Sequence, residues 1–258
     1  LVEPLSLDEA YLDVTHNKPG LATATAVAKQ IRAEIREELA LNASAGVAPN
    51  KFLAKIASDW RKPNGLFVIQ PHEVQDFLAP LAVRKLPGVG GATESALATL
   101  GVATVADLRA LPLAALNARF GKQGRRLYEL ARGIDERAVC PDQPRRSLSA
   151  ETTFEQDRRL SELDETLVDL AARVWRHVDA AEGHARTVVL KLKTADFRII
   201  TRSHTPAAPP DSAATLADIA RRLLTRVELD PATRYRLAGV GLANFRDPDE
   251  DDAQPGLF

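Results

Sequence analysis

The segment 147–245 limits most narrowly the folds open to this chain, because its apolar residues change their spacing in a fixed order. In some stretches apolar and polar residues alternate, as in strands. These stretches are interspersed with longer ones in which apolar residues recur every three to four positions, as in amphipathic helices. The expected elements are strand 147–154, helix 161–181, strand 187–195, strand 197–204, helix 213–227 and strand 237–245. This β-α-β-β-α-β order predicts a four-stranded sheet backed by two helices.

The first half of the chain shows two different patterns of expected secondary structure. Up to residue 72, helices at 21–39 and 51–60 alternate with strands at 42–48 and 66–69, after an opening hairpin. This alternation predicts part of an α/β layer. From 73 to 140 the patterns are short helices joined by Gly-rich turns, which predict a compact helical domain. The expected fold class is therefore multidomain, α/β and α+β.

Composition sets the remaining boundaries. Residues 141–146 are rich in Pro and Arg and are expected to be a linker before the sheet domain, 147–245. Residues 246–258 are acidic and poor in apolar side chains, so they are expected to form a disordered tail. A chain of 258 residues with 45% apolar content can build two or three cores.

Charge and cysteine content indicate the cellular compartment of the protein but not its activity. The formal net charge of −1 hides a mildly basic body, because acids are concentrated in the tail. A single cysteine, Cys140, excludes an intramolecular disulfide and fits a reducing cytosol. No apolar run has the length of a membrane span, and residues 1–30 show no signal-peptide pattern. We expect a cytoplasmic protein without a membrane partner, and a chain without Met to be part of a longer protein.

Two adjacent carboxylates, Asp8 and Glu9, interrupt a strand-forming run at 4–15. In a regular strand they would point to opposite faces, but at a hairpin turn their oxygens can converge on one hard cation. Mg²⁺ takes carboxylate oxygens and keeps positions open for water and phosphate. The ordinary alternative for a lone Asp-Glu pair is a solvated turn.

A second motif, Leu86–Gly90, precedes an expected helix and is typical of a helix-hairpin-helix. Gly88 and Gly90 let backbone N–H groups approach a phosphate, and the helix N-terminus adds a positive dipole end. Contacts of this kind position a nucleic acid without reading its sequence. An ordinary Gly-rich connection between helices is the alternative.

Cations and hydroxyls also gather in the linker and in the strand 197–204. Alternation in that strand separates its two arginines from its hydroxyl side chains. A polar sheet face in water explains these residues, and a DNA backbone would suit them equally. The candidate contacts are Arg145, Arg146, Arg198, Thr201, Arg202 and Ser203.

These motifs together resemble the Y-family translesion DNA polymerases over essentially the whole chain. The segments similar to the palm of that family are Leu5–Thr15, Ser44–Asp59 and Lys62–Gly65. The segments similar to the thumb and to the start of the little finger are Pro87–Gly90, Arg119–Lys122, Gly133–Arg137, Arg145–Ser147 and Glu151. The resemblance makes 1–72 a partial palm, 73–140 a thumb and 147–245 a little finger.

The resemblance implies nucleotidyl transfer from a dNTP to a primer 3′ hydroxyl on primer–template DNA, in lesion bypass and DNA repair, by a monomer with two Mg²⁺ ions. Asp8 and Glu9 would be two of the three palm carboxylates that bind the ions, and Lys62 would hold the triphosphate. Gly88 and Gly90 would contact the primer backbone, and the little-finger candidates would grip DNA. The first palm strand, with the third carboxylate, and the fingers are expected outside this chain, which alone is expected to be inactive.

The C-terminal residues Gln254, Leu257 and Phe258 follow an acidic run that is too charged to pack. They resemble the short peptide by which bacterial polymerases attach to the sliding clamp, so the clamp is an expected partner. An accidental apolar terminus is the alternative.

Two other functions remain open from the sequence. The chain could be a non-catalytic DNA- and clamp-binding fragment that keeps the thumb, little finger and tail but cannot complete the metal site. It could also be a helix-hairpin-helix nuclease or repair scaffold, although the lack of further clustered acids disfavours that function.

Overall fold

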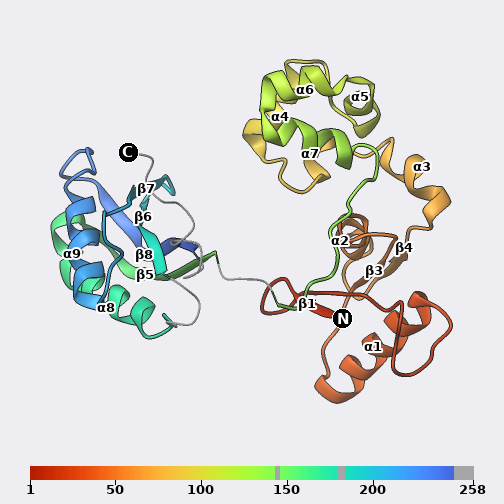
Figure 1. Ribbon diagram of the computed structural model, residues 1–258, viewed down its shortest axis with the longest axis horizontal. Helices are drawn as coiled ribbons and strands as arrows, with labels where there is room; N and C mark the ends of the chain where they lie inside the picture. The colour runs from red at the N-terminus through yellow and green to blue at the C-terminus, as the bar shows by residue number, and fades with distance from the viewer. Residues whose placement is uncertain (143–145, 179–183, 247–258) are drawn as a thin grey trace, which may run out of the picture. The chain divides into compact units, whose positions relative to one another are not determined.

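The computed structural model describes residues 1–142, 146–178 and 184–246, and it divides into two compact units, Leu1–Asp142 and Gln143–Phe258 (Figure 1). Unit 1 begins with a hairpin of two short antiparallel strands, β1 (Val2–Pro4) and β2 (Ala10–Leu12), as predicted. Within the described residues, none of the helices has the length and apolar character that a membrane crossing requires.

The rest of the α/β part of unit 1 is built on a parallel pair of strands. β3 (Ala45–Val47) and β4 (Leu66–Val68) pair in parallel and are connected through helix α2 (Lys51–Trp60), while α1 (Ala24–Leu39) precedes β3. Local capping explains where both helices begin. The side chains of Thr23 and Asn50 accept hydrogen bonds from the backbone N–H groups of the first turn.

Short helices form the remainder of unit 1, as the sequence predicts. They are η1 (Pro71–Glu73), α3 (Val74–Leu78), η2 (Val83–Lys85), α4 (Gly91–Ala98), α5 (Val105–Ala110), α6 (Leu113–Phe120) and α7 (Lys122–Leu130). One cluster of buried apolar residues runs from Phe52 and Leu53 of α2 to Leu127 and Leu130 of α7. The helical part therefore shares a core with α2, across the boundary expected at residues 72/73.

Unit 2 has the predicted β-α-β-β-α-β order. Its elements are β5 (Ser147–Arg159), η3 (Leu160–Glu162), α8 (Asp164–Trp175), β6 (His184–Thr194), β7 (Ile199–His204), α9 (Ala213–Leu224) and β8 (Arg234–Arg246). The strands form one antiparallel sheet in the order β5-β8-β6-β7. Buried residues of α8 and α9 pack against alternate residues of the sheet, such as Val188 and Val240, so both helices cover the same face (Figure 1).

Several expected element bounds in unit 2 are wrong: β5 continues to Arg159, α9 ends at Leu224 and β8 starts at Arg234. Phe197 does not begin a strand: it lies in the turn between β6 and β7 with a φ of 67°, and β7 starts at Ile199. The helix expected at 161–181 is shorter, because its first residues form η3 and α8 ends at Trp175. Arg246, expected to begin the tail, is the last residue of β8, whereas the expectations for Arg145 and for residues 247–258 lie outside the described residues.

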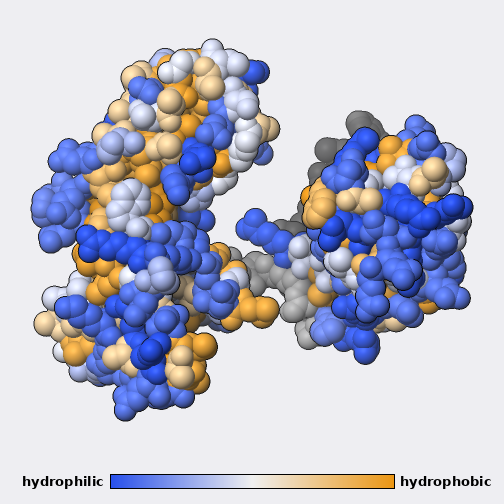
Figure 2. Space-filling view, turned by 180° about the vertical axis from the view of Figure 1, so that it is seen from behind, coloured by the Kyte–Doolittle hydropathy of each residue, from blue (hydrophilic) through white to orange (hydrophobic). Residues whose placement is uncertain are grey.

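The two units differ in the character of their surfaces. Figure 2 shows more apolar surface on unit 1 than on the visible face of unit 2. Among the described residues, most of the large exposed apolar side chains also belong to unit 1, including Leu5, Leu7 and Leu12 of the opening hairpin region. The hairpin that holds the two adjacent carboxylates is thus attached without burying its apolar side chains.

Candidate active site and DNA-binding surfaces

Asp8 and Glu9 lie at the tip of the β1–β2 hairpin, where the sequence predicts them. The N–H groups of Leu5 and Ser6 donate to the Glu9 carbonyl at 2.8 and 3.2 Å, which closes the turn. Ser6 Oγ donates to Asp8 Oδ1 at 2.8 Å and fixes that side chain. Asp8 is exposed and Glu9 is half-buried, so both carboxylates remain accessible from solvent.

An ion-pair network connects this turn to Lys62. Lys55 Nζ lies 2.6 Å from Glu9 Oε1 and 3.8 Å from Asp59 Oδ2, and Lys62 Nζ lies 2.6 Å from Asp59 Oδ1. The Asp59 hydrogen bond and charge raise the pKa of Lys62, and the charges of Glu9 and Asp8 add to the increase. Asp8, Glu9, Lys55, Asp59 and Lys62 therefore form one charged cluster.

The turn after α2 fixes the position of Lys62. Arg32 of α1 donates from Nη2 to the backbone and side-chain oxygens of Asn64, at 2.7 and 2.8 Å. Gly65 has no room for a side chain, because a Cβ there would lie 1.9 Å from the Arg61 carbonyl oxygen. These two observations account for the Asn-Gly of the turn that follows the helix carrying Lys55 and Asp59.

The charged cluster contains oxygen donors of the kind that metal ions take. Carboxylate oxygens such as those of Asp8 and Glu9 are the donors that hard divalent cations prefer. Within the described residues, however, no group of three or more His, Cys, Asp or Glu side chains could hold a metal ion. The donor chemistry of these two carboxylates thus fits a divalent cation.

The predicted helix-hairpin-helix turn joins η2 to α4. Gly88 has a φ of 83°, which an L side chain rarely adopts, and Gly90 lies at the N-cap of α4. A Cβ at either glycine would meet nothing within 4 Å, so the backbone here is open to an approaching group. Gln123 of α7 donates to the Gly88 carbonyl at 3.0 Å and holds the turn.

The structure separates the predicted contacts of β7. Thr201 and Ser203 are exposed on the sheet face that α8 and α9 leave open, whereas Ile200 is buried on the helix-covered face. Arg202 lies on the Ile200 side, and its Nε donates to the Arg226 carbonyl at 2.8 Å. Arg146 and Arg198 are exposed, before β5 and before β7 respectively.

The open face of the sheet also carries cations that the sequence analysis did not single out. Lys191 Nζ pairs with both Glu151 oxygens, at 2.8 and 2.9 Å, across the central strand. The ring of Phe197 is 58% exposed and lies 4.8 Å from Lys193 Nζ and 4.0 Å from the Arg236 guanidinium. The alternation of Lys191 and Lys193 along β6 was the available signal.

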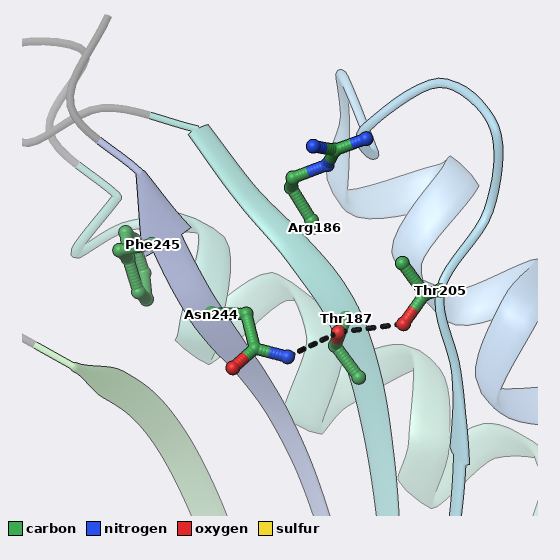
Figure 3. Close-up of a pocket in the computed structure, with 5 residues that line it drawn as sticks. All are labelled: Arg186, Thr187, Thr205, Asn244 and Phe245. Carbon is green, nitrogen blue, oxygen red and sulfur yellow. Dashed lines mark hydrogen bonds between the residues drawn. The ribbon is translucent and has the colours of Figure 1, made fainter. Parts of the chain in front are cut away.

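A pocket of about 460 Å³ lies at one end of the same sheet (Figure 3). Thr187 Oγ1 joins Thr205 Oγ1 at 2.7 Å and accepts from Asn244 Nδ2 at 2.8 Å, and Arg186 and Phe245 complete the lining. None of the residues predicted to bind DNA, nucleotide or metal lines this pocket.

Comparison with known proteins identifies the family. The impB/mucB/samB family matches residues 1–59, its C-terminal domain matches 145–257, and the DNA polymerase-iota thumb domain matches 84–135. DNA polymerase IV of Xanthomonas euvesicatoria pv. vesicatoria is 58% identical over all 258 residues, which cover 72% of that protein. The chain belongs to the Y-family DNA polymerases. DNA polymerase IV of Neisseria meningitidis serogroup C is 48% identical over 95% of this chain and 70% of its own.

Solved structures of Y-family DNA polymerases have the same fold. A Y-family chimera, Dbh-Dpo4(243-245)-Dbh, matches 95% of this chain and 71% of its own, with a TM-score of 0.79 and 30% identity. A structure titled insertion ternary complex of Dbh DNA polymerase matches with a TM-score of 0.58 and 29% identity. The predicted family, fold class and enzyme class, a DNA-directed DNA polymerase, are confirmed. DNA synthesis in a translesion role is supported at the level of the family.

Proposed function

We propose that this part of a Y-family polymerase supplies two metal-binding carboxylates and a triphosphate-binding lysine to a nucleotidyl-transfer centre. The observation that carries the proposal is the charged cluster, which brings Asp8 and Glu9 within electrostatic reach of Lys62 from separate segments. Asp8 and Glu9 would hold Mg²⁺, and Lys62 would bind the phosphates of an incoming dNTP as a point charge.

The residues of the cluster would have separate roles in an in-line phosphoryl transfer. Two bound Mg²⁺ ions would supply Lewis acidity for the primer 3′ hydroxyl and the leaving pyrophosphate. Lys62 orients the triphosphate and balances its negative charge, which is how positioning and electrostatics lower the barrier of this reaction. Lys55 pairs with Glu9 Oε1, so Glu9 can offer Oε2 to a cation, and Asp59 gives Lys55 a second acidic partner.

The test is template-directed primer extension by the natural full-length protein and by the isolated 258-residue chain. We expect the full-length protein to add the nucleotide complementary to the template base and the isolated chain to bind primer–template without extending it. The reason is that Asp8 and Glu9 have no third carboxylate beside them in the described residues. Extension by the isolated chain would contradict this expectation, and no extension by the full-length protein would contradict the proposed function.

We also propose that two surfaces hold the DNA backbone. The thumb turn at Gly88 and Gly90 offers an open backbone next to a helix N-terminus, which suits a phosphate. The open face of the unit 2 sheet offers hydroxyls and ammonium groups, which suit phosphates without base recognition. Its members are Lys191, Lys193, Thr201, Ser203 and Arg236, with Arg145, Arg146 and Arg198 as further candidates.

Removing two cations of the open face should change how salt affects DNA binding. In the double variant Lys193→Met and Arg236→Met, the slope of log affinity against log salt should fall in magnitude by about 2, because each phosphate contact contributes about 0.9. Fluorescence anisotropy with a labelled duplex at several salt concentrations measures this slope. Arg202→Met is the matched control, because its guanidinium is bound to Arg226 on the other face. Equal slopes for both variants and the parent would contradict the proposed surface.

The sliding clamp remains a proposed partner through Gln254, Leu257 and Phe258, which lie outside the described residues. Two apolar side chains beside an amide suit a small pocket on a partner, and tethering would raise the local concentration of a weakly bound polymerase. A clamp pull-down that is unaffected by deletion of 254–258 would exclude this anchor.

A further inference from the structure

The hairpin that carries Asp8 and Glu9 is not held by apolar packing. Within the described residues, it contributes no side chain to the apolar cluster of unit 1, and Leu7 at its tip is fully exposed. Its buried side chain is that of Glu3 in β1, a residue only 8% exposed. Two-stranded hairpins are marginally stable by themselves in water. The position of the carboxylate turn must therefore depend on polar contacts.

Lys51, the first residue of α2, makes the buried contact. It is 7% exposed, and its Nζ donates to Glu3 Oε1 at 2.8 Å, to Glu3 Oε2 at 2.6 Å and to the Ala138 carbonyl at 3.0 Å. All three ammonium protons are thus used. Glu3 Oε2 also accepts from the Cys140 N–H at 2.8 Å. The Lys51 and Cys140 hydrogen bonds lower the pKa of Glu3, so its carboxyl group is ionised at neutral pH.

The segment that follows α7 is fastened at the same place. Besides the contacts at Ala138 and Cys140, Asn50 Nδ2 donates to the Gly133 carbonyl at 2.8 Å. We call residues 133–140 the strap. The first turn of α2 therefore holds both the carboxylate hairpin and the strap that leaves the helical part of unit 1.

The same helix contacts the hairpin a second time through Lys55, four residues after Lys51 and so on the same face of α2. This outer contact, from Lys55 to Glu9, is only partly buried. A cation bound by Glu9 would compete with it, because the cation and the Lys55 ammonium group would then share one carboxylate. The inner pair, Lys51 and Glu3, contains no proposed ligand and can persist through the reaction.

We propose that the Lys51–Glu3 pair is a positioning device that holds the Asp8–Glu9 turn for catalysis when a cation competes with the outer contact. The inference rests on the proposed function of Asp8 and Glu9. Lys51 does not touch substrate; it acts through the hairpin, and it couples the placement of that turn to the strap. The reaction should consequently be more sensitive to this pair than DNA binding is.

The experiment compares Lys51→Met, Glu3→Gln, the double variant and Lys51→Arg in the natural full-length protein. Single-nucleotide kinetics should show kcat reduced at least about tenfold in Lys51→Met, since displacement of a catalytic group by about 1 Å can cost 100-fold. The Mg²⁺ concentration for half-maximal rate should rise, while primer–template Kd changes less than about twofold. Lys51→Arg, which keeps the charge, should recover part of kcat. Lys29→Met is the control for loss of one exposed surface charge.

The double variant tests whether Lys51 and Glu3 act as a pair or independently of each other. If Lys51 and Glu3 act together, the double variant should lose no more kcat than Lys51→Met alone. Additive losses, an unchanged Mg²⁺ dependence, or equal losses in kcat and DNA affinity would each overturn the inference, the last because it indicates general unfolding. Glu3→Gln keeps the side-chain volume and two polar atoms, so it tests the pair even if Lys51→Met does not fold. Full activity in Asp8→Asn would instead refute the proposed function, whatever the Lys51 variants do.

Discussion

Replacing Asp8 by Asn in the full-length protein should reduce primer extension by at least about 100-fold, because losing even a group that only supports a metal ligand costs 10- to 100-fold. The amide keeps the size of the side chain and can still accept from Ser6, but it lacks the negative charge that attracts a divalent cation. Single-turnover extension at saturating primer–template measures the effect. Primer–template affinity should stay within about twofold, since Asp8 lies outside the proposed DNA surfaces.

Two further variants make this result specific. Glu9→Gln should have a comparable effect and should also release Lys55 from its 2.6 Å ion pair. Asp76→Asn, at an exposed acid in α3 of the same unit, should leave extension unchanged. Normal extension by Asp8→Asn, or an equal loss in Asp76→Asn, would mean that the hairpin carboxylates are not metal ligands.

Elements with strong local signals could be predicted from the sequence. The bounds of α2 follow from the Asn50 cap and from the apolar face that begins at Phe52. The six elements of the little finger follow from their spacing alone. Phe197 was assigned to a strand because apolar alternation shows only which side chains share a face. Its positive φ, which is uncommon for a bulky residue, cannot be seen in that alternation.

Only those site residues that are neighbours in the sequence could be placed together from the sequence. Asp8 and Glu9 are neighbours in a turn, so their sequence suffices to place them together. The roles of Lys55 and Asp59 depend on the approach of the hairpin to α2, across more than 40 residues, which no spacing rule encodes. For Arg202 the alternation was right, but only the packing of α8 and α9 decides which face of the strand is covered.

The largest effect on stability is expected at Asp135, in the strap. Its side chain is fully buried and accepts from the Phe52 N–H at 3.0 Å, from Arg137 Nε at 2.7 Å and from Arg126 Nη2 at 3.1 Å. Burial raises the pKa of Asp135, but the Arg137 hydrogen bonds and the two guanidinium charges outweigh it and lower the pKa from 3.8 to about 2. The carboxylate therefore joins α7, the strap and the first turn of α2.

Asp135→Asn should destabilise unit 1 by about 3 kcal/mol at pH 7, since breaking a buried ion pair typically costs 3–5 kcal/mol. The lowered pKa of Asp135 contributes about 2 kcal/mol to the free energy of unfolding of the parent. This contribution is fully present above pH 4 and is lost as the pH falls through about 2. The difference between parent and variant should therefore narrow on acidification. Urea unfolding followed by Trp60 fluorescence, in a Trp175→Phe background that leaves no tryptophan in unit 2, measures it. A difference that stayed constant from pH 7 to pH 2.5 would show that the charge of Asp135 is not what holds the strap to α2.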